Sequence, residues 1–237
     1  MKTYNKKGQA PSAWGWLLWL SLSCLVGVMG CGGSPATVHR YLLEYPPPVV
    51  RVPATLDVAL TVVPFTVDEA FNSTAMLYRP SPNVSDSYRY HRWRVDPGSM
   101  ATDFIIRDFR QSRLFRAILT RGSAGESRFR LEGSVEEIQE INSPGGWQAA
   151  LTLSITLLDM RDPDLSTRLV FQKTLQRLEA IPEKTPAGLA RGVSRAMQQL
   201  SQVIQGEVYQ AARTRLRSPG KALGGKKLNN TREKPTT

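Results

Sequence analysis

The sequence has few of the side chains that most often carry enzyme chemistry, because its 237 residues include two cysteines and two histidines. The histidines, His39 and His91, are far apart, and no His-x-x-x-His or cysteine-rich spacing offers a metal site. The sequence contains no Gly-x-Ser-x-Gly nucleophile elbow and no Walker-type phosphate loop. These absences predict a protein that is not an enzyme and that uses no metal and no cofactor.

Long apolar runs are also scarce, and the one present covers residues 14–29, WGWLLWLSLSCLVGVM. Three lysines, Lys2, Lys6 and Lys7, precede it. Its length of about 16 residues is just short of the ~20 that a helix needs to span a bilayer. A basic start, a short apolar run and small residues after it are typical of a secretory signal. The alternative interpretation is a signal-anchor helix that stays in the membrane.

The run ends in Val28-Met29-Gly30-Cys31, which resembles the lipobox where bacterial lipoproteins are acylated on cysteine and cut before it. Cys24 fits less well, because Ser21 stands where the aliphatic residue should be. We predict a lipoprotein signal peptide at residues 1–30, lipidation of Cys31 with acyl chains such as palmitate, and a tether at residues 31–40. An ordinary signal peptide with a cysteine nearby by chance is the alternative.

The residue after the lipidation site is Gly32, not the aspartate that often retains lipoproteins at an inner membrane. In a bacterium with two membranes this predicts anchoring in the outer membrane, facing the periplasm. Removal of Cys24 with the signal leaves Cys31 alone, so no disulfide within the chain is expected. We therefore expect the hydrophobic core to hold the fold.

Positive charge gathers at the two ends of a chain whose formal net charge is +11. Residues 213–237 carry eight basic residues and one acidic residue, whereas residues 31–212 are close to neutral. The end segment has too few large apolar residues to order itself, which predicts a disordered basic tail. Contact with anionic lipid headgroups or peptidoglycan is the alternative role. For an exported protein we expect no nucleic-acid partner.

Alternating apolar residues predict a sheet within residues 41–212. The clearest strand places Leu151, Leu153, Ile155 and Leu157 on one face and small polar residues on the other, which favours antiparallel neighbours. A bulge is expected at residues 136–138, and the last strand is expected to turn Leu169, Phe171 and Leu175 to the core. Strands are predicted at residues 41–45, 56–67, 76–78, 88–95, 115–120, 129–135, 151–157 and 168–180.

Two helices are predicted from capping signals and apolar spacing. Asp96-Pro97 begins one, which extends to about Leu114, and Thr185-Pro186 begins an amphipathic helix of about 27 residues. The predicted fold class is α+β: a mostly antiparallel sheet of five to seven strands with two main helices packed on one face, a two-layer sandwich.

The order of several short segments carries a family resemblance. These are Arg40-Tyr41-Leu42-Leu43, Val62-Val63-Pro64-Phe65, Met76-Leu77-Tyr78-Arg79-Pro80, Tyr88-Arg89-Tyr90-His91-Arg92-Trp93 and Asp96-Pro97. From about Tyr41 to Gln205 the chain resembles the ABC-type transport auxiliary lipoprotein family, the outer-membrane partners of MCE-type lipid transporters such as the paraquat-inducible system. The basic tail is not part of the family pattern.

The resemblance implies a lipid-anchored protein without enzymatic activity that docks an MCE-type transporter at the outer membrane for lipid transport between membranes. The implied partners are an MCE-domain protein and the permease and ATPase, which are separate chains. Phospholipid is a further candidate ligand, and some relatives self-associate into rings, so a homo-oligomer is a candidate assembly. An outer-membrane lipoprotein that regulates cell-wall synthesis is the alternative function.

The aromatic and basic run at residues 88–94 is the strongest candidate for a contact surface, because Tyr, Trp and Arg are the residues that anchor protein interfaces. The alternative is a strand whose aromatic rings pack on the core while its arginines extend to solvent. We predict that the surface which meets the transporter comprises Tyr78, Arg79, Tyr88, Tyr90, Arg92 and Trp93.

Four glutamates lie close together in one predicted strand: Glu132, Glu136, Glu137 and Glu140. The pattern predicts a solvated strand face, and a patch for a basic partner is the alternative. General acid–base chemistry by such carboxylates needs a pocket around them.

Overall fold

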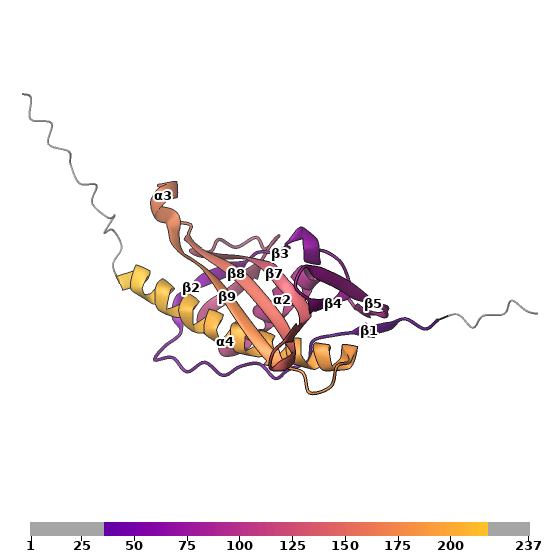
Figure 1. Ribbon diagram of the computed structural model, residues 1–237. Helices are drawn as coiled ribbons and strands as arrows, with labels where there is room; N and C mark the ends of the chain where they lie inside the picture. Colours follow the sequence, from indigo (N-terminus) through magenta and orange to yellow (C-terminus); the bar gives the residue numbers. More distant parts are fainter. Residues whose placement is uncertain (1–35, 218–237) are drawn as a thin grey trace, which may run out of the picture. The chain divides into compact units, whose positions relative to one another are not determined.

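The computed structural model describes residues 36–217, in which nine strands form one sheet with helices packed against it (Figure 1). Among these residues no helix has the length and apolar character needed to cross a membrane. The helical segments are the 3₁₀ turn η1 (Glu69–Phe71), α2 (Pro97–Ser112), the short α3 (Leu165–Arg168) and α4 (Pro186–Arg217). The strands are β1 (His39–Tyr41), β2 (Leu56–Val62), β3 (Thr66–Val67), β4 (Ala75–Ser81), β5 (Val84–Trp93), β6 (Phe115–Thr120), β7 (Phe129–Ser143), β8 (Gly146–Asp159) and β9 (Leu169–Ala180).

The three longest strands, β7, β8 and β9, form an antiparallel meander. The apolar residues predicted on one face of β8 are all buried, and the expected bulge in β7 is present as a register shift between Val135 and Glu137. Leu169 was predicted to face the core but is 46% exposed. A second register shift, at Leu157 and Leu158 of β8, puts the start of β9 out of phase with the alternation, and this turns Leu169 outward.

The other edge of β7 holds three separate strands in succession. Along β7, Phe129 pairs with Leu60 of β2, Ser134 with Thr66 of β3, and Glu140 with Tyr78 of β4. All three run parallel to β7. Next, β6 pairs with β2, β5 with β4, and β1 with β5. The sheet therefore widens beyond β7 into two branches, β2–β6 at one end and β4–β5–β1 at the other.

The prediction of a mostly antiparallel sheet of five to seven strands was wrong, although the α+β class is confirmed. Five of the eight strand pairings are parallel, and the sheet is mixed. The alternation of β8 correctly indicated antiparallel neighbours, since β7 and β9 both run antiparallel to it, but it gave no information on the strands that pair with the other edge of β7. Pro64 also divides the predicted strand at residues 56–67 into β2 and β3.

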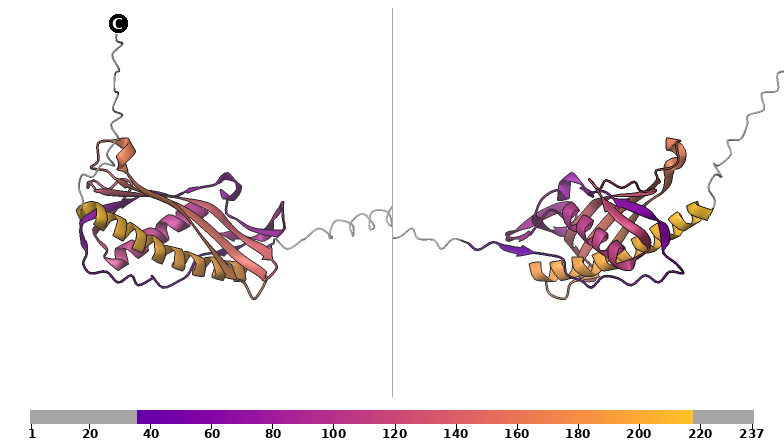
Figure 2. Two further views of the ribbon diagram at one scale, coloured as in Figure 1. Left: turned by 60° about the vertical axis from the view of Figure 1, so that its left-hand side comes forward. Right: turned by 180° about the vertical axis from the view of Figure 1, so that it is seen from behind.

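Helices α2 and α4 lie on one face of the sheet and contact each other, as Figure 2 shows. Asp96 caps α2 by accepting a hydrogen bond from the Ser99 amide at 2.9 Å, and Thr185 Oγ1 accepts one from the Gly188 amide at 3.0 Å. Both helix starts agree with the predicted signals. Helix α2 ends at Ser112, and the next residue, Arg113, has a φ of 51°, in the left-handed region typical of a helix C-cap.

Helix α4 continues to Arg217, beyond the predicted boundary at residue 212. Arg215 explains the extension, because its guanidinium binds the Asp162 carboxylate at 2.6 Å and the Thr167 carbonyl at 2.9 Å. The first five residues of the predicted tail are thus helical. The rest of that tail, the predicted signal peptide and Cys31 lie outside the described residues.

A buried carboxylate joins the two helices to the segment after β1. Asp108 of α2 is 0% exposed, and its Oδ2 accepts hydrogen bonds from Tyr45 Oη at 2.9 Å and Ser201 Oγ at 2.6 Å. Arg107 Nε donates to its Oδ1 at 2.8 Å. Burial, with Asp108 as a second cause, raises the pKa of Tyr45, so this phenol stays protonated and donates. Gln205, also fully buried, donates from Nε2 to Ser201 Oγ at 3.3 Å and so extends this polar group within the core.

Candidate functional site

The predicted contact run forms a wide bulge in β5. Ala75 of β4 pairs with Arg92 and Leu77 pairs with Ser87, so residues 88–91 stand opposite one residue of β4, Met76. Arg92 Nη1 closes the bulge by donating to the Tyr88 carbonyl at 2.8 Å and to the His91 carbonyl at 3.2 Å. The bulge breaks the alternation of a regular strand over residues 88–91.

Aromatic rings gather at the bulge. The ring centroids of Tyr78 and Tyr88 are 4.9 Å apart, and those of Tyr88 and His91 are 6.1 Å apart. Tyr41 Oη is 2.9 Å from His91 Nδ1, and the His39 ring stacks on His91 at 5.2 Å. Sequence reasoning missed His39 and Tyr41, because only the parallel pairing of β1 with β5 brings them here.

The six predicted contact residues divide into a surface group and a buried one. Tyr90 is 41% exposed, and Tyr78, Arg79, Tyr88 and Arg92 are half-buried. Trp93 is 1% exposed and lies in the core. Its side chain is therefore not available at the surface. The exposed residues beside the bulge include Leu42, Val84, Arg89, Arg94 and Val95.

Glu140 was predicted on a solvated strand face, and this was wrong, because its side chain is 0% exposed. The parallel pairing of β4 with β7 covers it, and Tyr88 Oη donates to its Oε2 at 2.9 Å. Burial raises the pKa of Glu140, while Tyr88 and the nearby Lys184 oppose the rise. Lys184 Nζ itself lies 3.8 Å from the centroid of the Trp147 ring. The buried Glu140 carboxyl group therefore links the rings at the bulge, which we call the aromatic surface, to the core.

We expect the protein to lose stability as the pH rises above 4.5, the ordinary pKa of glutamate, and we expect Glu140→Gln to make this loss smaller. With a raised pKa in the folded state, the folded protein binds more protons than the unfolded chain just above that pH, so stability falls as pH rises through this window. Glutamine does not titrate. Urea unfolding between about pH 4 and pH 8 measures the effect. Glu132→Gln, at an exposed side chain of the same strand, is the control, and equal profiles for Glu140→Gln and the parent protein would contradict the prediction.

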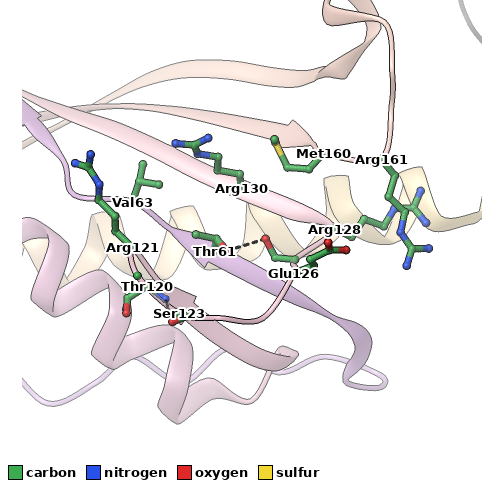
Figure 3. Close-up of a pocket in the computed structure, with 12 residues that line it drawn as sticks. Thr61, Val63, Thr120, Arg121, Ser123, Glu126, Arg128, Arg130, Met160 and Arg161 are labelled. Carbon is green, nitrogen blue, oxygen red and sulfur yellow. Dashed lines mark hydrogen bonds between the residues drawn. The ribbon is translucent and has the colours of Figure 1, made fainter.

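A second site, an arginine-lined cleft of ≈ 500 Å³, lies at the other end of β7. Glu140 lies ten residue steps along β7 from Arg130 in the cleft, which corresponds to about 33 Å along an extended strand. Figure 3 shows the lining side chains, which come from the end of β2, the β6–β7 loop, the start of β7 and the residues after β8. The cleft is lined by Thr61, Val63, Thr120, Arg121, Gly122, Ser123, Glu126, Ser127, Arg128, Arg130, Met160 and Arg161.

Sequence reasoning did not single out the cleft, because its residues come from three separate segments, 61–63, 120–130 and 160–161. Their meeting depends on the parallel pairing of β2 with both β6 and β7. Thr61 Oγ1 and Ser127 Oγ share a hydrogen bond of 2.7 Å, and the Met160 amide donates to the Arg128 carbonyl at 2.7 Å. These contacts hold the segments against one another.

Within residues 36–217 no group of three or more His, Cys, Asp or Glu side chains could hold a metal ion. The aromatic surface offers rings and cations, and the cleft offers guanidinium and hydroxyl groups. Both are suited to binding.

Comparison with known proteins identifies the fold and the family. Protein XCC0632 from Xanthomonas campestris, of family DUF330, has 18% sequence identity, and the alignment covers 77% of this chain and 100% of that chain with a TM-score of 0.66. An uncharacterised protein has 11% identity over 73% of this chain and 99% of its own, with a TM-score of 0.56. No curated protein gives a significant match. These likenesses concern the fold alone.

The family model for the ABC-type transport auxiliary lipoprotein component matches residues 41–205. The match runs from the last residue of β1 to the middle of α4, which is also the range of the sequence resemblance. It includes the lining of the cleft and all of the first site except His39. The chain therefore belongs to the ABC-type transport auxiliary lipoprotein family.

Proposed function

We propose that this lipoprotein is a non-enzymatic component of an MCE-type ABC transporter, which it docks at the outer membrane for lipid transport between the membranes. The observation that carries the proposal is the family match over residues 41–205. The MCE-domain protein, the permease and the ATPase are the proposed partners. Palmitate and related acyl chains on Cys31 are the proposed anchor.

The proposed docking surface comprises Tyr78, Arg79, Tyr88, Tyr90 and Arg92, with Arg89 added because the bulge exposes it. Aromatic and arginine side chains contribute the largest energies at protein interfaces. The bulge supports this role, because it removes Tyr88, Arg89 and Tyr90 from regular pairing with β4. Trp93 is left out, because it packs in the core.

The position of the docking surface relative to the proposed anchor also supports the role. Val38 is the residue before β1, which pairs directly with the bulged strand β5. Six residues lie between it and Cys31, and the seven residue steps from Cys31 to Val38 span at most about 25 Å in an extended chain. Acylation of Cys31 would therefore keep the docking surface close to the bilayer.

Crosslinking in living cells, followed by pull-down of the full lipidated chain from membranes and mass spectrometry, tests the function. We expect recovery of an MCE-domain protein with its permease. Tyr90→Ala combined with Arg89→Glu is expected to lower that recovery at least about tenfold, since interface anchors of this kind are worth 2 kcal/mol or more when removed.

Arg110→Glu, at an exposed position of α2, is the matched control and should leave the recovery unchanged. Cys31→Ser should move the protein out of the membrane fraction. Recovery of cell-wall synthases without any transporter subunit would overturn the proposal and favour the regulator of cell-wall synthesis. Equal recovery with the docking variant and the control would overturn the assigned surface.

A further inference from the structure

The geometry points to an anion site in the arginine-lined cleft, which we infer binds a ligand through a phosphate group. The source of the phosphate is either a phospholipid headgroup, which presents a phosphodiester, or free inorganic phosphate. This inference goes beyond the proposed function and stands whether or not the partner is an MCE-type transporter. Figure 3 shows the side chains that carry it.

The cleft has the size and the concave shape of a small-molecule site, which distinguishes it from a surface for a protein partner. The cleft volume of ≈ 500 Å³ lies in the range of small-molecule sites. Its lining brings four arginines and several hydroxyl groups together, with Val63 and Met160 as apolar walls. Arginine presents a planar fork of donors that matches phosphate oxygens, and hydroxyls add single donors. A concave site also concentrates the positive potential of the guanidinium groups.

Two of the four arginines have no competing anion. Arg121 and Arg161 are exposed, and within residues 36–217 neither guanidinium makes an ion pair or a hydrogen bond. Arg121 stands at a tight turn, in which the Ser123 amide donates to the Thr120 carbonyl at 3.0 Å. Gly122 has φ of +94°, which allows this turn. The turn fixes the backbone from which Arg121 extends.

The other two arginines are held in place by acids. Arg128 Nη2 lies 3.1 Å from Asp159 Oδ2, and Asp159 is itself buried and shared with Arg215 of α4. Asp159 Oδ1 also accepts the Arg161 amide at 3.2 Å. Arg128 Nε is a buried donor without an acceptor in the described part of the chain. Arg130 lies 3.2 Å from Glu132. Asp159 therefore positions the Arg128 side chain and the Arg161 backbone at the cleft.

Glu126 is the one carboxylate in the lining, and its substitution distinguishes a site for an anion from a site for a cation. A negative side chain beside the site repels an anionic ligand and would favour a cationic one. Glu126→Gln should thus strengthen binding of phosphate a few-fold. If the site instead served a cation, the same change would weaken binding.

Calorimetric titration of the full chain in detergent micelles tests the site. The probes are inorganic phosphate and glycerophosphoglycerol, a soluble phosphodiester headgroup, with sodium chloride at matched ionic strength as the blank. Arg121→Gln combined with Arg161→Gln is expected to weaken binding at least about tenfold, because two charge-assisted hydrogen-bonding groups are removed. Neither side chain has a described partner, so the fold should tolerate the change.

Arg110→Gln on α2 is the control for charge alone and should bind the probes like the parent protein. Tighter binding of glycerophosphoglycerol assigns the site to lipid headgroups, and tighter binding of inorganic phosphate assigns it to the free ion. The inference is overturned if neither probe binds, or if the double variant binds as tightly as the parent. Weaker binding by Glu126→Gln would overturn it too.

Discussion

Asp108→Ala is expected to lower the free energy of unfolding by about 3–5 kcal/mol, since removing one member of a buried ionic group leaves its partners uncompensated. Asp108 is fully buried and accepts hydrogen bonds from Tyr45, Ser201 and Arg107. Without the carboxylate, two hydroxyl groups in the core lose their acceptor, and each costs about 1–3 kcal/mol. Denaturation by urea, followed by far-UV circular dichroism, measures the loss.

The control for Asp108 is Asp103→Ala, an exposed aspartate on the same helix, which is expected to change stability by less than about 0.5 kcal/mol. Asp108→Asn keeps one carbonyl acceptor and should lose less than the alanine variant. If Asp108→Ala and Asp103→Ala have the same stability, the buried group does not join the two helices as described.

Trp93→Ala is expected to cost about 3–5 kcal/mol of unfolding free energy, because it empties a large site in the core. Trp93 is 1% exposed and pairs with Tyr41, while its amide donates to the Thr74 carbonyl at 2.8 Å. The indole nitrogen has no hydrogen-bond partner among the described residues. The ring therefore acts by packing. Thermal and urea unfolding of the purified protein measure the change.

Trp93→Phe separates packing from partner contact. Phenylalanine keeps most of the apolar volume and removes the unpaired N–H group, so its cost should stay below about 1.5 kcal/mol. Recovery of the transporter in the pull-down should also be retained by this variant. A large loss of recovery with unchanged stability would show instead that Trp93 contacts the partner.

Local signals in the sequence were sufficient for the starts of α2 and α4 and for the bounds of β6. Asp96-Pro97 and Thr185-Pro186 mark the starts of α2 and α4, because capping and first-turn proline act within a few residues. Strand β6 was predicted with the bounds that the structure has. The family resemblance was also read from short segments, and the match over residues 41–205 agrees with it.

The candidate sites depend on tertiary structure more than the helix starts and strand β6 do. The bulge in β5 cannot be read from the run at residues 88–94, because it results from how β4 and β1 pair with that strand. Glu140 looked like a solvated residue because nothing in its own segment indicates the parallel neighbour that covers it.

The sequence by itself determined the α+β class, the capped helices, the alternation of β8 and the membership of a lipoprotein family. These features rest on local periodicity and short motifs, which neighbouring residues decide. Tertiary structure decided the parallel pairings along β7, the burial of Glu140 and the meeting of Arg121, Arg128 and Arg161 in one cleft. Those features depend on contacts between residues far apart in the chain. Apolar residues spaced with a period of two or 3.6 show which face of a strand or helix is buried, but they do not show which partner buries it.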